Sequence, residues 1–380
     1  MSLRITYVGP LPPLRGGIPQ HGARLVEALV RQGHEVSVES WDALYPRRLY
    51  PVAPVTAEER AAPGYTLPPG RVRDSLHWAK PWSWWAAGRR AGGGDLIVFP
   101  WWVPAQAPAV RTFLSAAGRV PRVGVIHDVV LPKRHRADRR LAHLALRPLT
   151  GAVVHNDHVR TQLRQLLPDL PTDRIVTVDH PPNQPLTPQP LPDRPPLELL
   201  LFGHVRSYKG LDHVLDAMAL GDGAGLDTRL TVAGQFWQPI EPWQQRIDAM
   251  GLGDRVTLRP GYVPDADLPD LFAAHHLVLT PYSTASQSGV IPLATAAGRP
   301  SVVTPVGGLA DQITDGVDGT VAADLSAAAL ADAIARADAD LERLAEGTRR
   351  ARATWDDVAA AVVEAADLAE VSGATTRAHP

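Results

Sequence analysis

Short apolar runs alternate along this chain with longer stretches in which apolar residues recur at helical spacing. The runs predict strands at 3–9, 35–40, 95–99, 122–126, 151–154 and 174–178, then at 198–202, 228–232, 255–258, 277–280 and 300–304. The longer stretches predict helices at 20–32, 138–146, 157–167, 210–219, 326–345 and 355–369. Strand and helix in alternation indicate the α/β class, with parallel sheets covered on both faces.

Proline interrupts this alternation once. Eight of the sixteen residues between 181 and 196 are proline, which blocks both helices and central strands. A length of 380 residues also favours two domains over one core. We therefore expect a first domain at 1–180, a linker at 181–197 and a second domain at 198–354. A closing helix at 355–370 is expected to cross back to the first domain, and residues 371–380 to form a loose tail.

Composition narrows the function classes. The chain has no cysteine, which excludes disulfides, thiolate metal sites and cysteine nucleophiles. No apolar run is long enough to span a bilayer, and the first expected strand begins at residue 3, which leaves no room for a secretory signal. These features favour a cytoplasmic protein.

Charge is divided unevenly along the chain, although its formal net value is only −2. Residues 1–180 contain 24 lysines and arginines against 14 acidic residues, a balance of +10, and the remaining 200 residues contain 14 against 26, a balance of −12. A basic half favours an anionic partner. The alternative is that the two halves merely attract each other.

Residues with binding chemistry follow the expected strands, where open parallel sheets bind their ligands. Arg206 and Lys209 lie between Gly203 and Gly210, after the strand at 198–202 and before a helix. Two cations at a strand end and a helix N-terminus suit a diphosphate. The alternative is a surface loop with two solvated cations.

Two further loops offer small polar groups to a ligand. Gly16 and Gly17 precede the first helix and form an anion-sized gap or a plain turn. The run Ser286, Gln287, Ser288 and Gly289 opens another helix, where it binds a phosphate or sugar hydroxyl or simply caps that helix. Neither GxGxxG nor GxxxxGK[ST] occurs, and the serine run is not GxSxG, which argues against dinucleotide enzymes, P-loop enzymes and serine hydrolases.

Histidines and tryptophans complete the candidates. His127 follows a buried strand beside Asp128 and suits a sugar contact, proton transfer or a structural role. His155 and His158 stand three residues apart, but no carboxylate or cysteine joins them at ligand spacing, so no metal site is expected.

Trp78, Trp82 and Trp85 recur at helical spacing and are expected in the core. Because cations lie nearby, the alternative is that these tryptophans contact a lipid headgroup or a sugar chain. Another cationic group, 133–136 with Arg139 and Arg140, leaves open contact with an anionic membrane.

These segments together resemble glycosyltransferase family 4, the retaining enzymes with the GT-B fold. The resemblance rests on Gly16-Gly17-Ile18, 33–36, 202–211, Gly261-Tyr262-Val263, 296–303, 306–309 and 315–319, and it covers nearly the whole chain. The segments around Trp101-Trp102, 233–237 and Ser286–Val290 look like a bacterial subgroup with a Gln-Ser-Gly loop. Most members of the family carry two glutamates there, and this chain has neither.

The resemblance implies two facing Rossmann-like domains with a cleft between them. The first would bind the acceptor through Trp101, Trp102 and Asp128, and the second would bind a nucleotide sugar. The donor-site residues would be Gly16 and Gly17 of the first domain with Gly203, Tyr262 and Ser286–Val290 (Ser286, Gln287, Ser288, Gly289, Val290) of the second. Backbone groups of Ser288, Gly289 and Val290 would take the place of the missing ribose-binding glutamate.

The implied reaction is transfer of a sugar to a glycan, lipid-linked or small-molecule acceptor with retention at the anomeric carbon. Arg206 and Lys209 would stabilise the departing diphosphate, His127 would contact the donor sugar, and no divalent metal or other cofactor would be required. The missing glutamates keep two alternatives open: an epimerase or pseudo-glycosyltransferase of the same fold, and a catalytically silent protein that binds sugar nucleotides. No nucleic-acid partner is expected.

Overall fold

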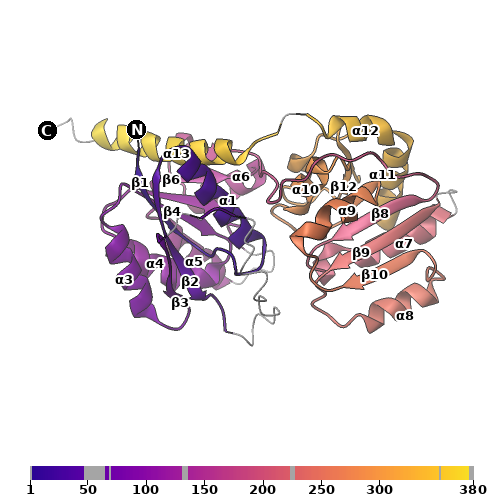
Figure 1. The fold of residues 1–380 in the computed structure, drawn as a ribbon, viewed down its shortest axis with the longest axis horizontal. Coiled ribbons are helices and arrows are strands. Elements are labelled where there is room, and N and C mark those ends of the chain that lie inside the picture. The colour runs from indigo at the N-terminus through magenta and orange to yellow at the C-terminus, as the bar shows by residue number, and fades with distance from the viewer. Residues whose placement is uncertain are drawn as a thin grey trace. The chain divides into compact units, whose positions relative to one another are not determined.

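The structure is a computed structural model in which residues 2–46, 65–67, 70–130, 136–222, 227–350 and 352–375 are described. It divides into two compact units, each with its own sheet and core (Figure 1). Unit 1 comprises Met1–Pro181 together with Ala353–Pro380, and unit 2 comprises Pro182–Arg352. The chain therefore returns to unit 1 at its C-terminal end.

The described part of unit 1 contains a seven-stranded sheet in which every neighbouring pair is parallel. Across the sheet the strands are β3 (Val72–His77), β2 (Glu35–Ala43), β1 (Arg4–Val8), β4 (Leu96–Trp101), β5 (Arg122–Ile126), β6 (Gly151–Val154) and β7 (Ile175–Thr177). The strand order reverses between β1 and β4. Open α/β sheets bind ligands beside such a reversal, at the carboxyl ends of the strands.

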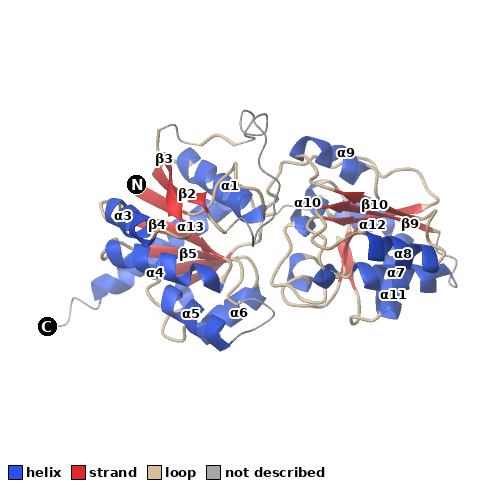
Figure 2. Ribbon diagram, turned by 90° about the horizontal axis from the view of Figure 1, so that it is seen from below, coloured by secondary structure: helices blue, strands red, loops and turns tan. Residues whose placement is uncertain are grey.

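Helices cover both faces of this sheet (Figure 2). One face packs against α1 (Gly17–Arg31) and α13 (Trp355–Thr375), and the other against α3 (Pro81–Ala91), α4 (Ala107–Ala116), α5 (Arg136–Leu146) and α6 (Asp157–Leu166). Strand β4 shows why two layers of helices are needed. Its side chains alternate between the two cores, Val98 toward α1 and α13 and Phe99 toward the other helices, and both are buried.

The described part of unit 2 contains a six-stranded parallel sheet. Its order is β10 (Val256–Pro260), β9 (Thr228–Gly234), β8 (Leu197–Phe202), β11 (Leu277–Thr280), β12 (Ser301–Val303) and β13 (Gly319–Val321). On one face lie α7 (Leu211–Asp222), α8 (Glu241–Ala249), α11 (Ala327–Ala339) and α12 (Leu341–Gly347), and on the other α9 (Leu268–Ala273) and α10 (Val290–Ala296). The α/β class and the pair of Rossmann-like parallel-sheet domains expected from the sequence are confirmed.

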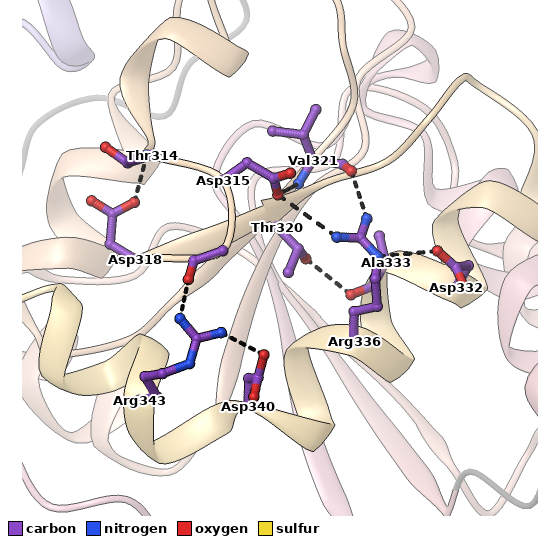
Figure 3. A network of polar contacts seen from close by, with 11 residues as sticks. Thr314, Asp315, Asp318, Thr320, Val321, Asp332, Ala333, Arg336, Asp340 and Arg343 are labelled. Atoms are coloured by element: carbon purple, nitrogen blue, oxygen red, sulfur yellow. Dashed lines mark hydrogen bonds and ion pairs between the residues drawn. The ribbon is translucent and has the colours of Figure 1, made fainter.

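Side-chain contacts hold the three-residue edge strand β13 against α11 (Figure 3). Arg336 donates to the carbonyl oxygen of Val321 at 2.8 Å and lies 3.8 Å from the carboxylate of Asp315. The hydroxyl of Thr320 donates to the carbonyl oxygen of Ala333 at 2.9 Å. Because a strand this short makes few ladder bonds, these contacts help to fix its position.

The sequence pattern missed two of the four edge strands, β3 and β13, and located the other two, β7 and β10. β3 reads Val-Arg-Asp-Ser-Leu-His and pairs only with β2, so most of its side chains are polar or partly exposed. β13 is three residues long. The predicted helix at 326–345 is also two helices, α11 and α12, which meet at Asp340.

The expectation that Trp78, Trp82 and Trp85 pack in the core is wrong. Trp78, in the turn before α3, is 43% exposed, and Trp82 and Trp85, in the first half of α3, are 67% and 55% exposed. The buried face of α3 carries small residues instead. A Cβ at Gly88 would meet the carbonyl oxygen of Phe113 in α4 at 2.3 Å, so the two helices approach too closely for a large side chain between them.

Candidate functional site

Two glycines bring together the loops that follow β8 and β9 in unit 2. Gly234 has a φ of 139°, and a Cβ there would meet the carbonyl oxygen of Gly203 at 1.9 Å. Beyond this close approach, Val205 and Phe236 pair as an isolated bridge. Side chains that are about thirty residues apart in the sequence therefore lie side by side.

Arg206 is held in place by an aromatic ring. Its guanidinium carbon lies 3.7 Å from the centroid of the Trp237 ring, a cation–π contact. The indole N–H of Trp237 donates to Nδ1 of His204 at 3.0 Å. Burial, and then the charges of Lys209 and Arg206, lower the pKa of His204 to about 4, so this imidazole is neutral near pH 7 and can accept that bond. The result is a guanidinium with a fixed plane.

Lys209 lies one turn further on, in the 3₁₀-helix Ser207–Lys209, and is only 9% exposed. Its Nζ lies 3.8 Å from the ring centroid of Tyr282 and 5.6 Å from that of Tyr208. Burial lowers the pKa of Lys209 to about 8, an effect that Tyr208 opposes and Arg206 adds to. Among the described residues, neither cation forms an ion pair with a carboxylate. Two adjacent cations without a counterion are stabilised by an anionic ligand.

The turn that places Lys209 requires glycine at the next position. Gly210 has a φ of 74°, which favours glycine, and a Cβ there would meet the carbonyl oxygen of Pro281 at 2.0 Å. Pro281 directly precedes Tyr282, the residue whose ring covers the Lys209 ammonium. The cation and its aromatic cover are therefore positioned by the same contact.

The serine-rich loop before α10 is closed by contacts within unit 2. The N–H of Ser288 donates to Oε1 of Gln312 at 2.6 Å, Nε2 of Gln312 donates to the Ser288 carbonyl at 2.9 Å, and the N–H of Val290 donates to Oγ of Ser288 at 3.2 Å. Ser286 and Ser288 are buried. Of the three backbone N–H groups expected to replace the missing glutamate, two are thus already bonded within the protein. The N–H that stays available belongs to the exposed Gly289.

Other expected donor-site residues of unit 2 lie around this centre. Gln287 is half-buried in the serine-rich loop. Tyr262 follows β10, two strands from β8, and is 42% exposed, and its hydroxyl donates to Oδ1 of Asp265 at 3.4 Å. Tyr262 is therefore the most accessible of these side chains and the farthest from the cation pair in the strand order.

Unit 1 contains a cluster of four histidines, which we call the histidine cluster: His21, His127, His155 and His180. His127 directly follows β5, His155 directly follows β6, His180 lies three residues beyond β7, and His21 lies in the second turn of α1. The parallel strands end at the same edge of the sheet, and α1 begins there too. The topology therefore brings together residues that are far apart in the sequence.

The histidine cluster is buried and tightly packed. Nε2 of His21 lies 2.9 Å from Nε2 of His155, within hydrogen-bonding distance, and the ring of Trp355 at the start of α13 packs edge-on to His21. Burial, followed by the charges of neighbouring histidines, lowers the pKa of His21 and His127 well below the usual value and that of His155 to about 3. These three imidazoles are neutral near pH 7.

Sequence reasoning selected His127 but missed its partners. It paired His155 with His158, whereas the structure places the ring of His158 beside Gln162, with 2.8 Å between their Nε2 atoms, and His155 against His21. His21 and His180 were not considered. A signal was present, because each of these histidines lies within a few residues of a strand end or a helix start, where the strands of one sheet converge.

Gly16 lies beside this cluster in the sequence, at the start of α1. Its φ of 126° is the conformation expected for a glycine before a tight helix entry, and Gly17 is the first residue of the helix. Further along α1, a Cβ at Gly22 would meet the hydroxyl of Tyr7 at 2.2 Å. The glycines thus set how closely α1 approaches β1. His127 and these glycines belong to unit 1, and the two cations belong to unit 2.

Of the expected acceptor residues, Trp101 is not available for contact in this structure. Its ring is fully buried in the core, and its indole N–H donates to the carbonyl oxygen of Val129 at 3.3 Å. Asp128 and Trp102 are half-buried. The indole N–H of Trp102 donates to the hydroxyl of Tyr45 at 2.9 Å. Of the expected cations at 133–136, residues 133–135 and the side chain of Arg136 lie outside what the structure describes.

Trp102 lines a narrow apolar pocket in unit 1, which we call the aromatic pocket. It is shallow and open to solvent, and its enclosed space has room for little more than a water-sized group. The wall is mostly aromatic and aliphatic and includes Trp41, Trp84 and Phe99. Gln106 is its main polar feature: it is 7% exposed, and its Oε1 accepts no hydrogen bond from the described residues. The pocket therefore suits an apolar group that brings one hydrogen-bond donor.

Comparison with known families gives a match that lies within unit 2. Residues 196–340 match the family model described as glycosyl transferases group 1. Two curated relatives are D-inositol 3-phosphate glycosyltransferases. The protein from Xylanimonas cellulosilytica is 33% identical over 187 residues, which cover 46% of this chain and 42% of the relative, and that from Mycobacterium marinum is 33% identical over 129 residues, which cover 34% and 28%. The matched regions thus span less than half the length of these relatives.

Solved structures match over nearly the whole chain. The Anabaena protein HepE in complex with UDP-glucose superimposes with a TM-score of 0.66 and 16% identity, covering 98% of this chain and all of that one. Sucrose-phosphate synthase from Thermosynechococcus elongatus gives a TM-score of 0.66 and 16% identity, covering 99% and 100%. At this identity the likeness shows the fold, which is GT-B. In the described part of the chain, no helix is long and apolar enough to span a bilayer.

Proposed function

We propose that this chain is a retaining glycosyltransferase that moves a sugar from a nucleotide-diphosphate donor to an acceptor. The observation that carries the proposal is the pair Arg206 and Lys209, two adjacent cations that have no carboxylate partner among the described residues. A diphosphate is the ligand that would supply the missing charge. The pair also lies inside the segment that matches a glycosyltransferase family.

In this proposal the cations act on the leaving group. As the bond between sugar and diphosphate breaks, negative charge grows on the diphosphate oxygens, and donors that are already in position stabilise it. Arg206 offers a plane fixed by Trp237, and Lys209 offers an ammonium in a site poor in water. With fixed cations in this role, we propose that transfer requires no divalent metal.

His127 would contact the donor sugar from unit 1. A neutral imidazole can accept or donate a hydrogen bond, as sugar hydroxyls require, and burial keeps His127 neutral by lowering its pKa. Gly16 and Gly17 would let the start of α1 approach the donor closely. Of the serine-rich loop, the backbone of Gly289 remains our candidate for the role of the missing glutamate.

We propose further that the acceptor is lipid-linked and that a small apolar group of it contacts the aromatic pocket. A shallow apolar pocket with one unbonded amide oxygen suits a small apolar group that carries a hydroxyl. Trp84 lines this pocket, and the neighbouring Trp82 and Trp85 of α3 are exposed. Exposed tryptophans next to Arg89 are suited to the interface of an anionic membrane, where such an acceptor would reside.

An anionic soluble acceptor is the second candidate. The curated relatives are named for inositol 3-phosphate, and residues 1–180 carry a net charge of +10. A phosphorylated polyol would use that charge and would have no need of the aromatic pocket. Variants of the pocket therefore separate the two acceptors: replacing Gln106 and Trp102 would reduce transfer to a lipid-linked acceptor and spare transfer to a polyol phosphate.

Incubation with a panel of nucleotide sugars tests the activity itself. A transferase releases nucleoside diphosphate slowly in water and faster with its acceptor, and the configuration of the product by NMR reports retention. A sugar-nucleotide epimerase would convert the donor without releasing diphosphate. A silent binding protein would show a thermal shift with one donor and no turnover, and either result would contradict the proposal.

A further inference from the structure

Three members of the histidine cluster have the arrangement of metal ligands. His21, His127 and His155 each offer a ring nitrogen, and the three nitrogens all lie within 4.8 Å of one another. All three side chains are at most 3% exposed. They come from α1, β5 and β6, three elements of unit 1 that are packed into one core, so their spacing is fixed by the fold.

The ring spacing agrees with shared coordination of one ion. The ring centroids are separated by 4.5 Å for His21 and His127, 5.0 Å for His21 and His155, and 5.6 Å for His127 and His155. Imidazoles bound to a tetrahedral Zn²⁺ at Zn–N distances of ~2.0–2.1 Å have nitrogens ~3.3 Å apart and ring centroids ~5 Å apart. The 2.9 Å between Nε2 of His21 and Nε2 of His155 would need to widen by only a few tenths of an ångström.

The backbone fixes the tautomer of one ligand. Nδ1 of His155 lies 2.9 Å from the carbonyl oxygen of Val178, which can only accept, so Nδ1 carries the proton and Nε2 carries the lone pair. A histidine whose second ring nitrogen donates to a backbone carbonyl is the usual arrangement around protein-bound metals. His180 repeats it, with Nδ1 2.6 Å from the carbonyl oxygen of Pro181. His180 lies beside the three ligands but outside their group.

The chemistry of these donors selects the class of ion. Three neutral imidazoles and no carboxylate suit a borderline divalent ion such as Zn²⁺, Co²⁺ or Ni²⁺, whereas Mg²⁺ and Ca²⁺ prefer oxygen ligands. Three protein ligands leave a fourth position for water or for a substrate oxygen. Binding would break the hydrogen bond between His21 and His155 and would require His21 to move its remaining proton to Nδ1.

We infer that His21, His127 and His155 form a binding site for one borderline transition-metal ion, with Zn²⁺ as the ion that it fits best. The site lies wholly in unit 1 and does not depend on the proposed function. It uses none of the residues proposed to bind the diphosphate, which belong to unit 2. The competing explanation is a metal-free cluster in which imidazoles bond to one another and hold α1 against β5 and β6.

Metal titration of the full chain, freed of any affinity tag and stripped with EDTA, distinguishes the two. Co²⁺ should bind with a stoichiometry of one and produce the visible ligand-field bands of a four- or five-coordinate site, and Zn²⁺ should displace it. His155→Asn and His21→Gln should each weaken binding by about 100-fold or more. His158→Asn, three residues along the chain from His155 but bonded to Gln162 instead, is the matched control and should bind as the wild type does.

A second measurement covers the case in which the variants fail to fold. X-ray absorption of the Zn²⁺-loaded wild-type protein should report three imidazole ligands at ~2.0–2.1 Å. Fewer than three imidazoles, affinity that is unchanged in His155→Asn and His21→Gln, or no stoichiometric binding of Co²⁺ would each overturn the inference and leave the metal-free cluster.

Discussion

Burial gives Lys209 a pKa of about 8, which makes its charge adjustable within an accessible pH range. An anion stabilises the charged form, so the complex with a nucleoside diphosphate has a higher Lys209 pKa than the free protein. The dissociation constant should therefore be constant below pH 8 and rise about tenfold per pH unit above it, until the pKa of the complex is reached. Calorimetric titration with nucleoside diphosphates from pH 6.5 to 9.5 measures this dependence.

Lys209→Arg is the control for this pH dependence, because a guanidinium stays charged throughout the range. Its affinity for the nucleoside diphosphate should be independent of pH. Affinity that stays flat to pH 9.5 in the wild type would remove Lys209 from the diphosphate site.

The lowered pKa of Lys209 also affects the stability of the fold. The pKa of Lys209 is lowered from 10.5, so the unfolded chain binds more protons than the folded chain between about pH 8 and 10.5. This residue's contribution therefore makes the fold more stable as pH rises through that window.

Arg206 should contribute to the rate through the transition state. Charge-assisted bonds to a diphosphate in a partly dry site are worth a few kcal/mol, so Arg206→Ala should lower kcat/KM by about 10²-fold or more without changing the far-UV spectrum. Lys209→Ala should have a similar effect. Arg259→Ala removes an exposed cation from β10 of the same unit and should leave kcat/KM unchanged. Near-normal turnover in both Arg206→Ala and Lys209→Ala would contradict the assignment.

Gly210 provides a stability test of the turn that carries Lys209. Gly210→Ala combines left-handed strain with a Cβ at 2.0 Å from the Pro281 carbonyl, and Gly316→Ala has the same strain, at a φ of 71°, with open space around the Cβ. We expect Gly316→Ala to cost about 1 kcal/mol and Gly210→Ala about 3 kcal/mol or more. Urea unfolding gives both values, and equal costs would show that the turn relaxes freely around the added methyl group.

Individual residues differ in how far the sequence alone identifies them as part of a site. Arg206 and Lys209 could be selected because their spacing between two glycines has a local meaning. For the histidine cluster the sequence offers only a weaker signal: each member lies near a strand end or a helix start, but His21 and His155 meet only when α1 packs beside the ends of β5 and β6. Trp101 and Trp102 are neighbours with opposite exposure, one buried in the core and one facing the aromatic pocket, and the sequence around them contains nothing that separates the two.

At the scale of elements, the apolar pattern located the central strands well because both of their faces are buried. It failed at two of the four sheet edges: at β3, where one neighbour is missing and most side chains are polar, and at β13, which is only three residues long. It also misjudged α3, whose large tryptophans point outward while glycine and alanine form the contact with α4. Large residues usually indicate the buried face of a helix, and an exception of this kind points to a binding surface.

The exposed face of α3 should bind anionic membranes. We expect the protein to co-sediment with anionic vesicles and to dissociate in high salt, because tryptophans insert at the interface and cations are attracted to the lipid charge. Replacing Trp82 and Trp85 by alanine should reduce the bound fraction several-fold. Leu220→Ala, which removes an exposed apolar side chain from α7 in unit 2, is the matched control. Binding that is unchanged in the tryptophan variant would place the membrane contact elsewhere or exclude it.

At the scale of the whole molecule, the change in the sign of the charge along the chain falls at the boundary between two units that carry different candidate binding features. Unit 1 contains most of the basic residues, the histidine cluster and the aromatic pocket, and unit 2 contains the half-buried Arg206 and the buried Lys209 within an acidic segment. The sequence could predict this division because the proline-rich stretch and the change in charge fall at the same place. It could not predict the environment of Lys209, since that depends on Tyr282, a residue more than seventy positions away.

The two proposals together predict how metal ions affect the activity of the whole protein. Turnover should persist in excess EDTA, because Arg206 and Lys209 neutralise the diphosphate without a metal ion. Added Zn²⁺ should then inhibit, because it would bind the imidazole of His127 that the donor sugar requires. The inhibition should be reversed by EDTA and should need about 100-fold more Zn²⁺ in His21→Gln, whereas His158→Asn should respond as the wild type does. Initial rates across a Zn²⁺ series measure these effects. An absolute requirement for Mg²⁺ or Mn²⁺, restored by adding the ion back, would show instead that a metal performs the work assigned here to the two cations.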